Sequence, residues 1–172
     1  MSVTRASVSA RGSALPLLFR HHTRTRVQAQ VTRPRPGSVL SFGHVDLRVS
    51  VNGDDVYVGR STDGVEVMSE IQRAHRYALS CNDVLQSAWI DVRRDQYDIL
   101  SDFVNRADDG HYDILRNNCV DFVDQALSTA GLNVEVRDLF DDRRLRAFGV
   151  HPVMVLKIVG PTRWWREMMS RM

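Results

Sequence analysis

Hydrophobic and polar residues alternate along residues 38 to 51, and this period of two predicts the first clear β-strand. One face would be buried and the other would meet water, with His44 on the wet face near the start of the strand. Asn52-Gly53-Asp54-Asp55 is typical of a hairpin turn and predicts residues 56 to 61 as the partner strand. Folding that hairpin places Ser61 or its neighbours across from His44. The apolar positions are Phe42, Val45, Leu47, Val49 and Val51, and the polar positions are His44, Asp46, Arg48 and Ser50.

Apolar residues recur at three- and four-residue intervals in several later segments, which is the spacing of a helix that buries one side. Shorter apolar runs predict strands. Together these segments predict an α+β fold. The predicted helices cover residues 66–79, 95–107, 119–130, 139–148 and 162–172; the predicted strands cover 88–92 and 152–159, with an extended piece over 132–136.

The start of the chain has a different composition from the rest. Seven of the 23 basic residues, all arginines, fall within the first 45 residues, which contain no Asp or Glu. We therefore predict an irregular, Arg-rich arm over residues 1–37, a main domain over 38–160 and a C-terminal helix over 161–172. A disordered tether or delivery segment is favoured for the arm over a transit peptide. A nucleic-acid-binding arm is disfavoured, because aromatic residues for base stacking are missing.

Composition also narrows the classes of function. No apolar run of about 18 residues is present, so we expect no stable membrane insertion. Two cysteines, Cys81 and Cys119, are too few for a disulfide-stapled scaffold. Neither a Cys-x-x-Cys nor a His-x-x-x-His spacing occurs, so we expect no metal and no cofactor. Cys81 has no base beside it and is interpreted as structural.

Cys119 stands where a polar turn becomes an amphipathic helix. Asn117 and Asn118 suit the N-cap, and Gly131 suits the C-terminal stop. Unpaired backbone N–H groups and the positive end of the helix dipole favour a thiolate over a thiol, so this position suits a nucleophile. The same N–H groups can hold an oxyanion. The alternative interpretation is a small apolar residue that begins a helix.

A thiol nucleophile needs a base, and His44 is the best candidate because a strand holds it stiffly. His111, eight residues before Cys119, is the reserve base. A third group would accept a hydrogen bond from the far nitrogen of the ring. Ser61, Asp46 and Asp63 all qualify, and the residues alone do not rank them.

Two short motifs in this order resemble a known family. Gly43-His44-Val45-Asp46-Leu47 precedes Tyr112, which leads into Asn117-Asn118-Cys119-Val120-Asp121-Phe122-Val123. Over residues 38–131 the chain resembles the circularly permuted branch of the NlpC/P60 papain-like superfamily, in which the histidine strand comes before the cysteine helix. The resemblance implies an antiparallel sheet packed against helices, with Cys119 as nucleophile and His44 as base. It points to Ser61, on the next strand, as the third residue.

The resemblance also implies a function. We expect a cysteine amidase or endopeptidase that cleaves amide bonds in the stem peptides of bacterial peptidoglycan. It would act as an antibacterial type VI secretion effector, delivered from one bacterium into the periplasm of another. The expected partners are a secretion-apparatus carrier and a cognate immunity protein. One alternative is an isopeptidase or a lipid acyl hydrolase or transferase acting on a host-cell substrate, and another is a catalytically inactive binding module.

Overall fold

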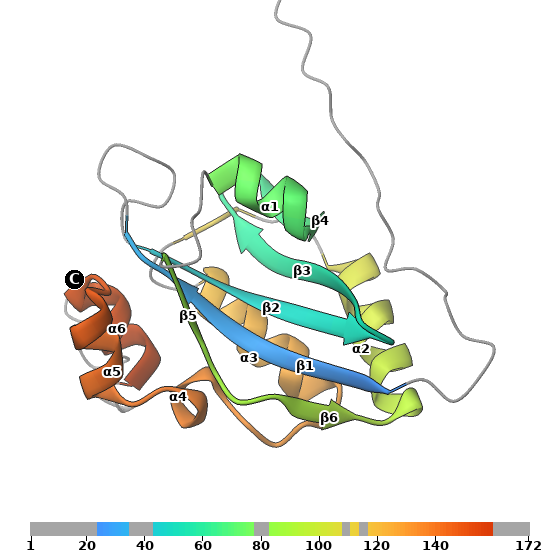
Figure 1. Ribbon diagram of the computed structural model, residues 1–172. Helices are drawn as coiled ribbons and strands as arrows, with labels where there is room; N and C mark the ends of the chain where they lie inside the picture. Colours follow the sequence, from blue (N-terminus) through green and yellow to red (C-terminus); the bar gives the residue numbers. More distant parts are fainter. Residues whose placement is uncertain (1–23, 35–42, 78–82, 108–110, 114–116, 160–172) are drawn as a thin grey trace, which may run out of the picture.

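The computed structural model of this 172-residue chain describes residues 24–34, 43–77, 83–107, 111–113 and 117–159. It is an α+β fold built on an antiparallel sheet, as the hydrophobic pattern predicted (Figure 1). The strands are β1 (Thr25–Thr32), β2 (His44–Val51), β3 (Asp54–Ser61), β4 (Gly64–Ser69), β5 (Val84–Gln86) and β6 (Ile90–Val92). The helices are α1 (Glu70–Tyr77), α2 (Arg94–Arg106), α3 (Cys119–Thr129), α4 (Val136–Leu139), α5 (Asp142–Phe148) and α6 (Pro152–Val159).

The strand order is β4-β3-β2-β1-β5, and β6 also pairs with β1. The predicted hairpin between β2 and β3 is confirmed, with Asn52 at φ 56° and Gly53 at φ 95° in the turn. Positive φ at both central residues is what an Asn-Gly hairpin turn requires. The β2–β3 ladder ends at the pair Asp46 and Gly59, although β1 stays paired with β2 as far as His44.

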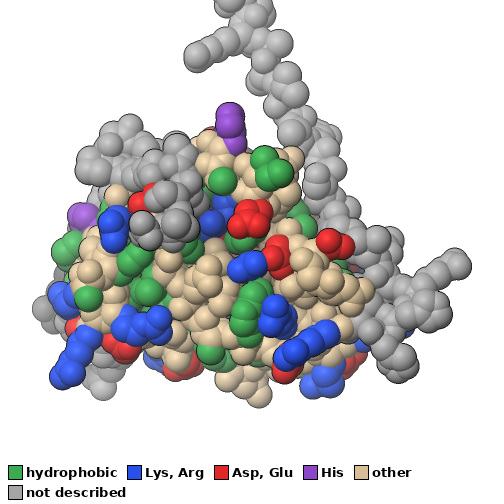
Figure 2. Space-filling model, in the orientation of Figure 1, with side chains coloured by type: hydrophobic (Ala, Val, Ile, Leu, Met, Phe, Trp, Pro, Cys, Tyr) green, Lys and Arg blue, Asp and Glu red, His purple; other side chains and the backbone are tan. Residues whose placement is uncertain are grey.

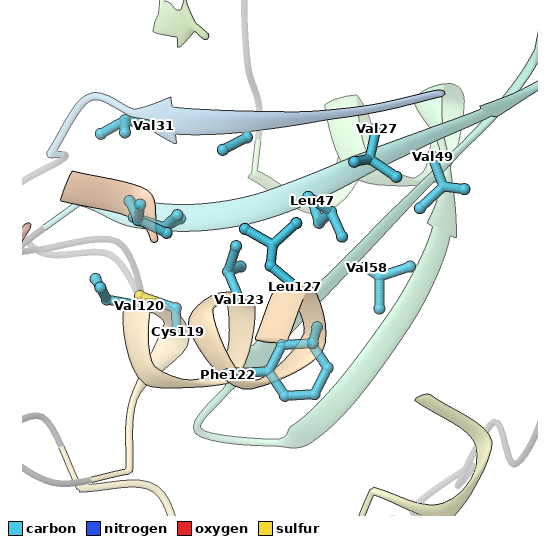
Figure 3. Packing of buried hydrophobic residues seen from close by; sticks show 14 of the residues in the cluster. Val27, Val31, Leu47, Val49, Val58, Cys119, Val120, Phe122, Val123 and Leu127 are labelled. Carbon is cyan, nitrogen blue, oxygen red and sulfur yellow. The ribbon is translucent and has the colours of Figure 1, made fainter. Parts of the chain in front are cut away.

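Alternation along β2 sends its side chains to two faces of the sheet. Val45, Leu47 and Val49 face α3 and join the main apolar core, where Cys119, Val123 and Leu127 of α3 meet them (Figure 3). Figure 1 shows α3 passing behind β1 and β2, with α1 at the β3–β4 edge of the sheet. Helix α3 therefore covers one face of the central strands, and α1 reaches the opposite face at His44 and Asp46.

The predicted wet face of β2 is not wet. Its residues His44, Asp46 and Ser50 are buried, and only Arg48 is half-exposed. At His44 and Asp46 the cause is α1, which lays Tyr77 and Arg73 over these two residues. Alternation identified the two faces correctly, but it carries no information on whether a later helix covers the polar one.

The prediction of an irregular arm was wrong for residues 25–32, which form a strand in the interior of the sheet. Val27, Ala29 and Val31 are fully buried and alternate with polar residues, so the strand pattern was present among arginines and glutamines. The arm also packs beyond the sheet, because Arg33 donates to the carbonyl of Phe148 and stacks on its ring. The rest of the predicted arm lies outside the described residues.

Two predicted elements have the wrong type. Residues 66–69 belong to strand β4, and α1 begins only after Ser69, whose side chain and that of Gln72 cap each other's backbone N–H. The predicted strand over 152–159 is helix α6, which begins at a proline as helices often do. A continuous apolar run does not distinguish a buried strand from a buried helix.

Other predictions agree with the structure more closely. Helices α2 and α3 lie at or within two residues of the predicted bounds, and β6 and α5 fall inside their predicted segments. Strand β5 was not predicted, and the proposed helix over 161–172 lies outside the described residues. Within the described part of the chain, every helix is too short or too polar to cross a bilayer.

Candidate functional site

Cys119 is the first residue of α3, as predicted, and its side chain is fully buried. The side chain of Asn118 caps the helix by accepting hydrogen bonds from the N–H groups of Val120 at 2.9 Å and Asp121 at 3.2 Å. Asp121 returns the contact by accepting from the N–H of Asn118 at 3.3 Å. This capping box fixes the sulfur at the helix start. It also occupies two of the N–H groups expected to hold an oxyanion, which leaves the N–H of Cys119 itself.

The sulfur of Cys119 touches donors from three directions. The Tyr112 hydroxyl donates to it over 4.0 Å, and the backbone N–H groups of Val45 and Val120 also interact with it. Burial nevertheless raises the pKa of Cys119 to about 11, against the opposing effect of these donors. The expectation that the helix start would favour a thiolate was therefore wrong, because burial outweighs the hydrogen bonds that these donors supply. Cys119 is a free, neutral thiol.

The turn before α3 is tied to strand β3. Arg60 donates to the side-chain oxygen of Asn117, and its guanidinium lies 5.8 Å from the ring centre of Phe122. Asn117 in turn donates to the carbonyl of His111 at 2.9 Å and pairs with Asp113 through backbone hydrogen bonds. Asn117 is therefore an anchor of this turn, and Asn118 is the N-cap. Sequence analysis did not single out Arg60.

His44, the predicted base, begins β2 and is only 4 % exposed. Its ring lies 5.4 Å from the ring of Tyr77 in α1 and sits over Gly59 of β3. A Cβ at Gly59 would be 3.0 Å from Nε2, so glycine leaves the room that the imidazole uses. Burial first, and the charge of Arg73 second, lower the pKa of His44 to about 3. The ring is therefore neutral.

Asp46 lies on the same face of β2 and is completely buried. Its Oδ2 accepts a hydrogen bond from Nε of Arg73 at 2.8 Å, and Arg73 also donates to the Thr32 hydroxyl at 3.2 Å. The guanidinium of Arg73 lies 4.6 Å from the ring centre of Tyr57. Burial raises the pKa of Asp46, and the charge and hydrogen bond of Arg73 oppose that rise. A buried ion pair thus fills the space beneath α1.

The other candidates for the third residue have different partners. The hydroxyl of Ser61 is half-buried and accepts from the N–H of Asp63 at 3.1 Å, within the β3–β4 turn. The carboxylate of Asp63 pairs with Arg76 of α1. Among the described residues, Nε2 of His44 has no hydrogen-bond partner, so it bonds to none of the three candidates.

Cys119 and His44 approach the same point of β2 from opposite faces. The sulfur reaches the N–H of Val45, which directly follows His44, while the imidazole leaves toward α1. Nε2 of His44 forms no hydrogen bond with the sulfur of Cys119. Both residues lie at the end of β2 that is no longer paired to β3.

A cavity of about 710 Å³ lies between α3, the segment that follows it and the end of α6. Cys119 and His44 do not line it. Lys157 of α6 pairs with Asp121 there at 2.7 Å, and burial raises the pKa of Asp124 to about 6. Its lining includes Val120, Asp121, Asp124, Glu135, Asp138 and Lys157.

The described residues contain no cluster of three or more His, Cys, Asp or Glu side chains arranged to hold a metal ion. On the face shown in Figure 2, the basic side chains of the described residues are interspersed with acidic ones. That view gives no continuous basic surface of the kind that tracks a phosphate backbone.

Sequence reasoning missed Arg73, Tyr77 and Gly59, which surround the His44 ring. The hairpin register carried a signal for Gly59, since it stands across from Asp46 on the same face as His44. Comparison of the chain with protein-family models, with curated proteins and with solved structures returned no match.

Proposed function

We propose that this protein is a cysteine hydrolase of amide bonds in which Cys119 is the nucleophile and His44 is the base. One observation carries the proposal. The sulfur lies at a capped helix start and against the N–H of Val45, the residue that follows His44, at the edge of β2 that β3 has left. A thiol at a helix start and a histidine on the strand beside it are the parts that acyl transfer needs, although here their side chains lie on opposite faces of β2.

The proposed reaction uses the neutral groups described above. Nδ1 of His44 takes the proton of Cys119, because Nε2 is buried against Gly59. The sulfur attacks the amide carbon, and the oxyanion is held by the N–H of Cys119 and the hydroxyl of Tyr112. The imidazolium returns its proton to the leaving amine as the C–N bond breaks. Water, deprotonated by His44, then hydrolyses the thioester and restores the thiol.

Activation is part of this proposal. A buried thiol with a pKa of about 11 and an imidazole with a pKa of about 3 do not exchange a proton readily. Substrate binding at the edge of β2 that β3 has left would have to open the packing around Cys119 and His44, because their burial produces both pKa values. Movement of the imidazole around β2 toward the sulfur would complete the pair.

The substrate we propose is a stem peptide of bacterial peptidoglycan, cut by a secreted antibacterial effector in the periplasm of the target cell. The resemblance of the Asn-Asn-Cys-x-x-Phe-Val block and the Gly-His strand to permuted NlpC/P60 enzymes supports this substrate.

A non-catalytic binding module is the second candidate. It is favoured by the position of the thiol and the imidazole on opposite faces of the sheet and by the neutral state of both groups. In that case Cys119 is a core residue, and the polar groups beneath α1 serve only the fold.

Digestion of purified peptidoglycan followed by mass spectrometry separates these functions. Wild-type protein should release fragments with new amine and carboxyl ends, and Cys119→Ala should release none. Cys81→Ser is the matched thiol control and should digest like wild type. Intact peptidoglycan, with intact isopeptide and ester substrates tested in parallel, would support the binding module. Cleavage of only the isopeptide or the ester would instead support the alternative of a host-cell substrate.

A further inference from the structure

Arg60 is a buried arginine on the face of the sheet that packs against α3. The residues before it on that face of β3 are Val56 and Val58, which belong to the apolar core or pack against it, so the face becomes polar at Arg60. Arg60 is only 7 % exposed and follows Gly59, the last residue of β3 that pairs with β2. Burying a guanidinium costs free energy unless its N–H groups find partners, so the contacts of Arg60 indicate its role.

Arg60 contacts both segments that meet at the thiol. On one side it donates to the side-chain oxygen of Asn117, in the turn that follows Tyr112. On the other side its guanidinium lies 5.8 Å from the ring centre of Phe122, near the start of α3, whose first residue is Cys119. The two segments are therefore fixed against the same side chain of β3.

Asn117 extends this contact to Tyr112. Its side-chain NH₂ group donates to the carbonyl of His111 at 2.9 Å, and its backbone exchanges hydrogen bonds of 2.9 and 3.1 Å with Asp113. His111 and Asp113 are the two neighbours of Tyr112, so the backbone of Tyr112 is held on both sides. Its hydroxyl donates to the sulfur of Cys119 over 4.0 Å. Burial raises the pKa of Tyr112, and the adjacent Cys119 adds to the rise, so the hydroxyl keeps its proton and remains a donor.

We infer that Arg60 and Asn117 are positioning residues that hold the hydroxyl of Tyr112 against the sulfur of Cys119. Their effect passes through Tyr112, the oxyanion donor of the proposed reaction, so this role rests on the proposed function. An oxyanion donor must lie about 3 Å from the developing charge, and a misplacement of about 1 Å lowers the rate strongly. A tyrosine on an unanchored turn would not keep that position.

Kinetics test whether the two residues act through Tyr112. Tyr112→Phe removes the hydroxyl and keeps the ring, and kcat should fall by about 10²- to 10³-fold with little change in KM. Arg60→Met and Asn117→Ala should each lower kcat by up to about 10²-fold. Neither change should lower kcat further in the Tyr112→Phe background, because the hydroxyl that they position is already gone. Further losses in that background overturn the inference.

The S–H stretching band of Cys119 in the Raman spectrum tests the same contact without hydrolysis. Cys81→Ser leaves Cys119 as the only thiol, so the band has one source. In this background Tyr112→Phe should shift the band, because the sulfur loses a hydrogen-bond donor. Arg60→Met and Asn117→Ala should shift it in the same direction. An unchanged band in any of the three variants overturns the inference.

Arg48→Met is the matched control. It removes an arginine from the opposite face of the sheet, where Arg48 pairs with Asp55, and it should leave both the band and kcat unchanged. Losses as large as those of Arg60→Met would overturn the inference, because any missing arginine of the sheet would then have the same effect. If Arg60→Met does not fold, Asn117→Ala decides, since the Asn117 side chain is only half-buried.

The two measurements separate this inference from the proposed function. If wild type cleaves no substrate but all three variants shift the band, the positioning of Tyr112 stands and the hydrolase does not. If Cys119→Ala abolishes cleavage but Arg60→Met and Asn117→Ala leave both the band and kcat unchanged, the hydrolase stands and the positioning role is overturned.

Discussion

The face of the sheet under α3 and the face under α1 are buried to a similar degree, but with different chemistry. Under α3 the side chains are aliphatic and aromatic, and they surround the thiol of Cys119. Under α1 lie an imidazole, a carboxylate and a guanidinium. Apolar residues of similar volume generally serve stability as well as a buried ion pair does. Stability alone therefore does not explain the polarity under α1, whereas the role proposed for His44 would account for it.

The largest effect should come from breaking the ion pair under α1. Arg73→Met leaves the buried carboxylate of Asp46 without its partner and should lower the free energy of unfolding by about 3–5 kcal/mol. Urea denaturation measures this loss. The double variant Asp46→Val, Arg73→Met removes both charges and should recover most of it.

Arg146→Met is the surface control for that comparison. Its partner Asp142 lies one helical turn away on an exposed face of α5, and its loss should leave the urea midpoint unchanged. A double variant as unstable as Arg73→Met alone would mean that the face under α1 needs its charges for folding.

The pH dependence of stability should reveal the buried imidazole. The pKa of His44 is lowered from 6.5 to about 3, so between these values the unfolded chain binds a proton that the folded chain does not. Stability therefore falls as the pH drops from 6.5 toward 3, by up to about 1.4 kcal/mol per pH unit. Urea denaturation across this range should give a shallower curve for His44→Phe. Parallel curves for the two proteins would show that His44 is not buried and neutral.

A smaller effect is expected from filling the space at Gly59. Gly59→Ala places a methyl group 3.0 Å from Nε2 of His44 and should cost about 1–3 kcal/mol of stability. The same change in a His44→Ala background should cost less, because the ring is gone. Equal costs in the two backgrounds, measured by urea denaturation, would mean that Gly59 and His44 do not share this space.

The smallest effect on stability belongs to the face under α3. Asn118→Ala removes the cap of α3 and should cost about 1 kcal/mol. Asp141→Ala removes the cap of α5 and is the matched control. The two should lose similar stability in thermal unfolding, but only Asn118→Ala should reduce hydrolysis, because it loosens the turn that carries Cys119. Equal activity in both variants would show that the Asn118 cap does not support hydrolysis at Cys119.

The local features around Cys119 could be predicted from the sequence. Asn118, Cys119 and Gly131 lie where capping chemistry places them, and the Asn-Gly turn brings β3 back along β2 in the predicted register. These features depend on neighbours within a few residues, which is why local patterns reach them.

The surroundings of His44 and Asp46 beneath α1 could not be predicted in the same way, because they depend on contacts between distant segments. Arg73 lies 27 residues from Asp46, and the strand pattern of Thr25–Thr32 was hidden in an arginine-rich segment. Burial then raised the pKa of Cys119, where a lowered pKa was expected, and it lowered the pKa of His44. The alternation of β2 predicts which residues share a face, but it does not predict what covers that face.

The central claim is that Cys119 and His44 act as one unit across β2. Initial rates of peptidoglycan hydrolysis for wild type, Cys119→Ala, His44→Ala and the double variant test it most directly. Residues that act as a unit are not additive, so each single variant should lose as much activity as the double variant. Cleavage that persists in Cys119→Ala, or losses that add in the double variant, would contradict the claim.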